Sequence, residues 1–313
     1  MSLYQTVSCS VTGHRKAEAG KLCEDATRVI HTKEVTVMAV ADGHGDSRCI
    51  FAHVGAALAV KGACAVLRDN AAGVGAADPS AYWNARRSEI ARSIACAFAL
   101  SVLEDYAVRC PDRCGEEELA ALRHFVRERY QAPSSQPRPP AVLRAMYLRR
   151  QQMEARLLPI LSLYGTTLRA TVLGKDYLFH LAVGDGDTVL LTPDEALWAL
   201  PATESFSTET ASLCEPLDRL LESFLFSFVP LREGAPTLMG GEGFEMLVLS
   251  TDGLRNSFCS DGQFLRYLSL LKKRISKRGT AALSAALRPA LGELSRNSVF
   301  QDDISLILAV KKA

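Results

Sequence analysis

Several features that mark specialised classes of protein are missing from this sequence. No run of about 18 apolar residues occurs, so no transmembrane helix is expected. Residues Met1 to Val11 lack a basic start followed by an apolar stretch, which argues against a signal peptide and for a cytoplasmic protein. The formal net charge is only +1, and no basic stripe is interleaved with aromatic residues. We therefore expect neither a nucleic-acid partner nor a membrane partner.

Paired cysteine spacing is missing as well. The nine cysteines are scattered, and only Cys110 and Cys114 lie close together. No second pair at zinc-ribbon spacing is present, and no His-x3-His segment follows. The odd number and the spread favour free thiols, with a zinc site or a disulfide at Cys110 and Cys114 as the alternative.

The composition that is present is that of a globular protein. Apolar residues make up 48% of the 313 residues and charged residues 23%. Strand-like segments in hairpin order are separated by helix pairs, which favours an α+β sandwich over alternating βαβ units. We predict a single domain spanning residues 1–313, with a helical excursion at about 80–160.

Hydrophobic periodicity places the expected elements along the chain. Strands are predicted at 5–11, 35–41, 166–172, 177–183, 188–191, 226–231, 244–250 and 304–310. Helices are predicted at about 48–67, 80–108, 116–130, 141–157, 216–224, 262–277 and 280–294. A breaker-rich loop is expected at 131–140 and a glycine-rich turn at 240–243. The arginines of the 141–157 helix (Arg144, Arg149, Arg150 and Arg156) are expected to form a solvated face, with a partner-binding face as the alternative.

Acidic residues recur where the predicted strands begin or end. They are Glu24-Asp25, Asp42, Asp185, Asp252 and Asp302-Asp303. Any one of them is an ordinary turn residue. Carboxylates gathered at one edge of a sheet repel one another unless a cation neutralises them, and such hard oxygen ligands suit Mg²⁺ or Mn²⁺. Two such ions about 3.5–4 Å apart can activate water, so the pattern indicates hydrolysis of a phosphate ester.

Six short segments follow one another in a characteristic order. They are Glu24-Asp25-Ala26, Val40-Ala41-Asp42-Gly43-His44-Gly45, Tyr164-Gly165-Thr166-Thr167, Ala182-Val183-Gly184-Asp185, Leu249-Ser250-Thr251-Asp252-Gly253-Leu254 and Asp302-Asp303-Ile304-Ser305. In this order they resemble the motifs of the PP2C (PPM) family of metal-dependent protein serine/threonine phosphatases. The resemblance spans residues 24 to 305 and is much more specific than any one motif.

The resemblance implies a fold, a metal centre and a set of roles. The fold would be a four-layer αββα sandwich of two antiparallel sheets flanked by helix pairs. Two Mn²⁺ or Mg²⁺ ions would bind at one end of it, and the enzyme would be a monomer acting on phosphoserine or phosphothreonine of a protein. His44 would protonate the leaving oxygen. The implied metal ligands are the bridging carboxylate of Asp42, the Gly43 carbonyl, Asp252, Asp302, either Glu24 or Asp25 directly or through water, and Asp185 for a weaker third ion.

The sequence departs from the family pattern in two places. An arginine that grips the substrate phosphate is often found four residues before the first acidic residue, where this chain has Gly20. Lys21 is the nearest substitute, although a lysine offers a point charge and no bidentate fork; Arg15 is farther away. A further family carboxylate is replaced by Asn256.

Two other interpretations remain to be compared with this one. Asp-Gly-His-Gly also occurs in subtilisin-like proteases, but Asp46-Ser47-Arg48 follows it here and a Gly-Thr-Ser-Met-Ala segment is missing. The second alternative is a metal-binding pseudophosphatase that acts as a regulatory or scaffold module. The missing arginine and Asn256 favour it, whereas the presence of Asp42, Asp252 and Asp302 argues against it.

Overall fold

Two five-stranded antiparallel sheets form the centre of the molecule in the computed structural model, which describes residues 3–75, 78–131, 140–193, 195–199, 210–231 and 244–311. The first sheet has the order β1 (Tyr4–Val11), β10 (Ile304–Lys311), β9 (Met246–Ser250), β6 (Asp187–Leu191) and β7 (Ala196–Trp198). The second has the order β2 (Ala26–His31), β3 (Thr36–Ala41), β4 (Leu168–Leu173), β5 (Tyr177–Val183) and β8 (Leu225–Pro230). The predicted α+β sandwich of antiparallel sheets is confirmed.

The central strands are mainly apolar on both faces, because helices cover one face of each sheet and the other sheet covers the opposite face. In β3, Val37 and Ala39 pack toward the helices, whereas Met38 and Val40 pack against the other sheet. All six residues of β3 are buried. Side chains alternate between the two faces of a strand, so a strand in the middle of four layers buries both faces and is mostly apolar.

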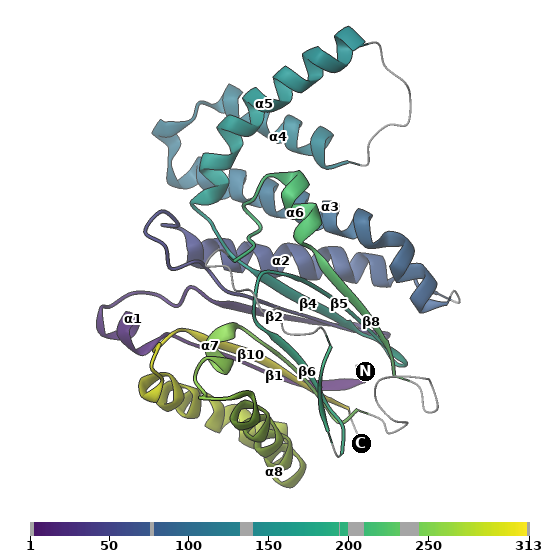
Figure 1. The fold of residues 1–313 in the computed structure, drawn as a ribbon, viewed down its shortest axis with the longest axis vertical. Coiled ribbons are helices and arrows are strands. Elements are labelled where there is room, and N and C mark those ends of the chain that lie inside the picture. Colours follow the sequence, from purple (N-terminus) through teal and green to yellow (C-terminus); the bar gives the residue numbers. More distant parts are fainter. Residues whose placement is uncertain are drawn as a thin grey trace.

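Helices cover the outer face of each sheet (Figure 1). Over the second sheet lie α2 (Ala52–Ala71) and α3 (Pro79–Arg109), with α4 (Glu116–Tyr130) and α5 (Pro140–Ser162) farther out and a short 3-10 turn, η1 (Pro111–Arg113), joining α3 to α4. Over the first sheet lies α8 (Asp261–Asn297). The kink of α8 at Gly279, which has φ of 77°, falls between the two helices predicted at 262–277 and 280–294.

Of the three short α-helices, two were missed by the sequence patterns and one was predicted. The helices α1 (His14–Glu18) and α7 (Asp252–Arg255) were not predicted, because four or five residues are too few for a periodic pattern. The helix α6 (Leu217–Ser223) agrees with the helix predicted at 216–224. The turn predicted at 240–243 and almost all of the loop predicted at 131–140 lie outside the described residues.

Two expectations about the whole chain can be compared with the structure. All nine cysteines, including Cys110 and Cys114, are free thiols. Among the described helices, none has the length and apolar character needed to cross a membrane.

Candidate metal centre and catalytic cleft

The acidic motifs meet at one end of the sandwich because of how the strands pair. Ala26 lies opposite Ala41, so Asp25 at the start of β2 lies beside Asp42 at the end of β3. Ser250 lies opposite Leu306, so the residues after β9 and those before β10 are neighbours. Asp252 follows β9 and Asp302 precedes β10. Antiparallel pairing thus gathers at one edge residues that are far apart in the sequence.

A cleft of about 920 Å³ opens at this end of the two sheets. Most of the residues predicted to form the site line it, namely Asp42, Gly43, His44, Asp185, Asp252 and Asp302. Lys16 and three residues of α6 (Arg219, Glu222 and Ser223) also line it. The position of Lys16 and of α6 in the cleft was not predicted.

The turn that carries Asp42 is held by the segment that precedes β4. The Asp42 carbonyl accepts hydrogen bonds from the Thr166 hydroxyl (2.8 Å) and the Thr167 amide (2.8 Å), and the Thr167 hydroxyl accepts one from the Asp42 amide (3.1 Å). A Cβ on Gly43 would lie 2.6 Å from the Glu24 carbonyl oxygen, so only glycine fits. The Gly-Thr-Thr motif therefore fixes the backbone on which the predicted bridging carboxylate sits.

The carboxyl groups at this end of the sandwich lie near one another: Asp25 is buried, Asp42, Asp252 and Asp302 are partly buried, and Lys16 is the nearby ammonium group. Burial, together with the charge of Asp303, raises the pKa of Asp25 to about 7. Burial raises the pKa of Asp42 well above its usual range, and the charges of Asp25 and Asp252 add to the effect. Burial also raises the pKa of Asp252 to about 6 and that of Asp302. Without a cation, the raised pKa values mean that these groups take up protons more readily than exposed carboxyl groups do, and a bound metal ion would act against that shift.

Two of these carboxylates have an oxygen without a hydrogen-bond partner among the described residues. Thr251 donates to Asp25 Oδ2 (2.8 Å) and Asn256 donates to Asp252 Oδ2 (2.8 Å), whereas Asp25 Oδ1 and Asp252 Oδ1 are buried and unpaired. Buried carboxylate oxygens of this kind are the donors that Mg²⁺ and Mn²⁺ take. In the described residues, no three acidic, histidine or cysteine side chains stand close enough to enclose an ion by themselves. The donor set fits a divalent cation whose shell also includes backbone and water oxygens.

His44 follows Gly43 in the same turn and also lines the cleft. Its amide donates to the Gly165 carbonyl (3.0 Å), and its Nε2 is buried without a partner among the described residues. Burial lowers the pKa of His44, while the charges of Asp185, Asp46 and Glu215 act in the opposite direction. His44 thus lines the cleft with one ring nitrogen that has no hydrogen-bond partner among the described residues.

The Asp185 turn rests on a buried arginine that the sequence patterns did not single out. Arg169 of β4 donates from Nε to the Asp185 carbonyl (3.1 Å) and is only 3% exposed. Thr210 donates to the Asp185 carboxylate (3.2 Å). Asp185 therefore stands at the cleft with its backbone fixed from inside the sandwich.

The family model described as protein phosphatase 2C matches residues 12–291, which is most of the chain. The chain belongs to the protein phosphatase 2C family. No curated protein matches it.

Solved structures share the PP2C fold over the whole length of the chain. A bacterial serine phosphatase is 13% identical with a TM-score of 0.55, covering 100% of this chain and 99% of that one. The photosystem II phosphatase PBCP is 16% identical with a TM-score of 0.55, covering 99% of each chain. The serine/threonine phosphatase Stp1 from Staphylococcus aureus is 13% identical with a TM-score of 0.52, covering 100% of this chain and 96% of that one.

A further similar solved structure is described with bound manganese. The catalytic domain of the serine/threonine protein phosphatase PstP, described in complex with two manganese ions, is 15% identical with a TM-score of 0.50 and covers 99% of each chain. At these identities the likeness establishes the fold of this chain, and its chemistry has to be argued from its own residues.

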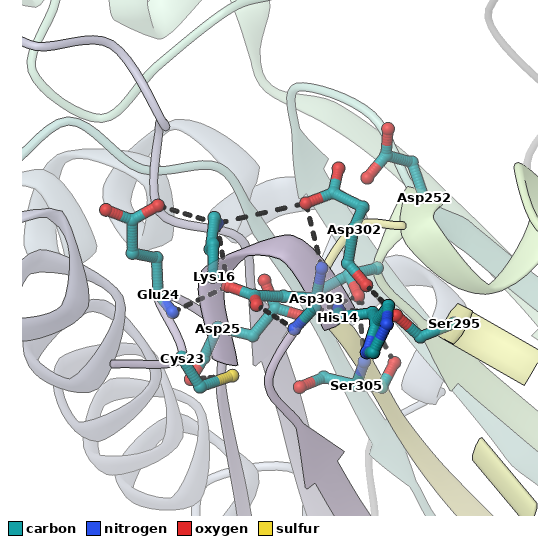
Figure 2. Close-up of polar contacts among 12 residues, drawn as sticks. His14, Lys16, Cys23, Glu24, Asp25, Asp252, Ser295, Asp302, Asp303 and Ser305 are labelled. Atoms are coloured by element: carbon teal, nitrogen blue, oxygen red, sulfur yellow. Dashed lines mark hydrogen bonds and ion pairs between the residues drawn. The ribbon is translucent and has the colours of Figure 1, made fainter. Parts of the chain in front are cut away.

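The lysine side chains near the cleft of this PP2C chain are arranged differently from the sequence-based expectation. Lys21, predicted to contact the substrate phosphate, is exposed, and the described residues that line the cleft do not include it. Lys16 does line the cleft, and its Nζ forms ion pairs with Glu24 (2.6 Å) and Asp303 (2.8 Å). Figure 2 shows the Lys16 side chain between these two carboxylates, with Asp302 and Asp252 on one side. Lys16 was missed because it belongs to no motif and lies on a five-residue helix.

Asn256 stands where the family has a carboxylate, and it supports a predicted metal ligand. Its side-chain amide donates to Asp252 Oδ2 (2.8 Å), which orients the predicted metal ligand one helical turn before it. A carboxylate at position 256 would add negative charge there, whereas the amide supplies a hydrogen bond. The signal available in the sequence was the four-residue spacing, which places the two side chains on one face of a helix.

Proposed function

We propose that this PP2C-family chain is a metal-dependent protein phosphatase that hydrolyses phosphoserine or phosphothreonine on proteins. The observation that carries the proposal is the group of carboxyl groups at one end of the sandwich, of which Asp25 is buried and Asp42, Asp252 and Asp302 are partly buried. Asp25, Asp42 and Asp252 have raised pKa values there because burial disfavours their charged forms. Carboxyl groups held close together destabilise a fold, and cation binding is the function that such a cluster serves.

The proposed roles follow the predicted set. The carboxylates of Asp42, Asp252 and Asp302 and the Gly43 carbonyl would hold two Mn²⁺ or Mg²⁺ ions, with Glu24 or Asp25 as a further ligand. Asp185 would contribute to a weaker third site. Divalent ions in such a centre lower the pKa of water and withdraw charge from phosphate oxygens.

The remaining residues of the cleft would handle the proton and the phosphate. The unpaired Nε2 of His44 would give a proton to the departing serine or threonine oxygen. Arg219 of α6 is exposed at the cleft and has no carboxylate partner among the described residues, so its guanidinium would meet the negative charge of the substrate. Lys21 stays a candidate for the phosphate only if its exposed side chain reaches the cleft when substrate binds.

Hydrolysis of p-nitrophenyl phosphate with Mn²⁺ tests the proposal. Wild-type protein should turn over the ester only when the metal is present, and Asp42→Ala should lower kcat/KM by roughly a hundredfold or more. Asp112→Ala removes an exposed carboxylate of η1 far from the cleft and should behave as wild type. Absence of metal-dependent turnover would contradict the enzymatic function, and full activity of Asp42→Ala would contradict the site.

A pseudophosphatase that binds phosphorylated partners is the second candidate. The pairing of Lys16 with Glu24 and Asp303 favours it, since a paired lysine is a weaker phosphate ligand. This candidate predicts that Mn²⁺ binds and stabilises the protein while p-nitrophenyl phosphate is not hydrolysed.

A further inference from the structure

Lys16 is the one lysine that reaches the acidic end of the cleft in the described residues. Its Nζ lies 2.6 Å from Glu24 Oε2, 2.8 Å from Asp303 Oδ2 and 3.8 Å from Asp302 Oδ1. The Lys16 side chain is 22% exposed, and the Asp303 side chain is 1% exposed. An ammonium group therefore sits where the acidic residues from two separate strand ends meet (Figure 2).

The position of Lys16 is fixed by the backbone that carries it. The Gly13 amide donates to Asp303 Oδ1 (2.6 Å), and the His14 amide donates to the Ser295 hydroxyl (3.1 Å). A Cβ on Gly13 would lie 2.4 Å from the Gln301 carbonyl oxygen, so α1 begins in direct contact with the segment before Asp302. The backbone at the start of α1 is thus held by the fold, and the ion pairs with Glu24 and Asp303 hold the Lys16 ammonium group.

Lys16 and a metal ion would compete for the carboxylate of Glu24. Asp303 is already occupied, because it also accepts the Glu24 amide (2.7 Å) and the Gly13 amide. Glu24 Oε2 is buried and makes no hydrogen bond in the described residues, and the Lys16 ammonium, 2.6 Å away, is its ion-pair partner. The early acidic pair therefore splits, because Glu24 faces an ammonium group whereas Asp25 lies beside Asp42.

We propose that Lys16 is a built-in counter-cation that withholds Glu24 from the metal centre, so that Asp25 alone supplies the early acidic ligand. The inference rests on the proposed function in one respect, namely that the cleft binds divalent cations. Lys16 acts through Glu24 and is a positioning residue. It lowers the affinity of the centre for its ions in two ways, by occupying a carboxylate and by placing a positive charge 3.8 Å from Asp302.

Calorimetric titration of metal-free protein with Mn²⁺ tests the assignment on four proteins: wild type, Glu24→Gln, Lys16→Met and Lys16→Met/Glu24→Gln. Glu24→Gln should change the Kd for Mn²⁺ by less than about threefold, because the negative charge of Glu24 is already neutralised by Lys16. Lys16→Met should tighten Mn²⁺ binding by roughly tenfold, because a carboxylate is released and a positive charge is lost. The double variant should bind Mn²⁺ more weakly than Lys16→Met, because the released carboxylate is absent, and should keep only the gain that comes from the lost positive charge.

The melting temperature of the metal-free proteins gives a second readout. Lys16→Met should melt at a lower temperature than wild type without metal and show a larger rise on addition of Mn²⁺. Lys16→Arg keeps the charge and should bind Mn²⁺ as wild type does. Lys33→Met removes an exposed lysine from the turn before β3 and serves as the control for loss of one positive charge.

The possible outcomes separate this inference from the proposed function. A tenfold or greater loss of Mn²⁺ affinity in Glu24→Gln would overturn the inference, because a direct ligand behaves in that way. Unchanged Mn²⁺ affinity in Lys16→Met, with a raised KM for p-nitrophenyl phosphate, would overturn it in favour of a phosphate contact. If wild-type protein binds no Mn²⁺ at all, the proposed function fails first. Should Lys16→Met not fold, Glu24→Gln alone decides the assignment.

Discussion

His180 shows how this sandwich stabilises a polar side chain between its two sheets. The ring is fully buried in β5, with Nδ1 2.8 Å from the Thr171 hydroxyl and Nε2 3.3 Å from the Thr188 hydroxyl. The Arg169 guanidinium lies 3.5 Å from Nε2. Burial, and then the charge of Arg169, lower the pKa of His180 well below its usual value. The fold therefore holds this histidine in its neutral form.

The neutral state of His180 predicts loss of stability in acid. Below a pH of about 6.5 the unfolded chain takes up a proton at this histidine and the folded chain does not, so unfolding becomes easier as the pH falls. The contribution has a slope of up to about 1.4 kcal/mol per pH unit. Urea unfolding of wild type and His180→Gln between pH 7 and 5 should show a smaller slope in the variant. His53→Gln, on the surface of α2, should keep the wild-type slope; an equal slope in all three proteins would contradict the prediction.

Gly253 is a residue whose missing side chain brings two acidic motifs together. A Cβ at this position would lie 2.0 Å from the Asp303 carbonyl oxygen. Gly253→Ala should therefore push α7 away from the start of β10, lower the free energy of unfolding by about 2–3 kcal/mol and weaken Mn²⁺ binding, because Asp252 moves with α7. Urea unfolding and Mn²⁺ titration measure the two effects.

A matched control for Gly253 exists on α8. A Cβ on Gly292 would meet no atom within 4 Å, so Gly292→Ala should stabilise the protein by up to about 1 kcal/mol through helix propensity. If both alanine variants had the same effect, close packing at Gly253 would not be the cause.

At the scale of elements, the outer helices hold α6 beside the cleft. Arg129 of α4 donates to the Asp218 carboxylate (2.5 Å), and Arg150 of α5 donates to the other oxygen of the same carboxylate. Arg150 also donates to Glu154 (2.9 Å). Within the predicted solvated face of α5, Arg150 is thus an exception, because folding brings α6 against it. The residue after Asp218 is Arg219, which lines the cleft.

Release of α6 should affect large substrates more than small ones. Asp218→Ala removes the carboxylate that both arginines bind, so α6 and Arg219 would no longer be fixed at the cleft. We expect KM for a phosphopeptide to rise by roughly threefold or more, while hydrolysis of p-nitrophenyl phosphate stays near the wild-type rate. Glu89→Ala, which breaks an exposed ion pair with Arg86 on α3, is the control. Equal losses on both substrates would indicate damage to the metal centre instead.

At the scale of the whole molecule, the carboxyl groups of the cleft join the two sheets. Asp25 directly precedes β2 of the second sheet, and Asp252 and Asp302 adjoin strands of the first. Thr251 links the two by donating to Asp25, while its hydroxyl accepts the Ser305 amide (3.0 Å). A cation bound at this end would therefore stabilise the contact between the sheets.

This arrangement predicts that metal binding raises the stability of the whole fold. At Mn²⁺ concentrations about 100 times the Kd, the free energy of unfolding should rise by about 2.7 kcal/mol, because the ion binds the folded chain. A thermal melt should shift upward by several degrees and return after chelation. Asp42→Ala should lose most of the shift, whereas Asp112→Ala should keep it. A shift of equal size in Asp42→Ala would place the ions elsewhere.

The sequence determined the layers and the positions of the acidic residues. Every position of β3 and β9 is buried, and all but Thr36 and Ser250 are apolar, which requires strands covered on both faces; the turn residues at their ends place Asp42 and Asp252 outside the sheets. These features could be read from the sequence because each depends on neighbours within a few residues. Periodic patterns also located most helices, except those too short to show a period.

Only the tertiary structure decided how the charges pair. Asp303 meets Lys16 across 287 residues of sequence, and Asp218 meets Arg129 across 89. No local pattern encodes such contacts, because they depend on which strand ends become neighbours and on how closely Gly13 and Gly253 let the backbones approach. The sequence placed Glu24 and Asp25 side by side as equal candidates for the metal, and the fold turned one toward a lysine and the other toward Asp42.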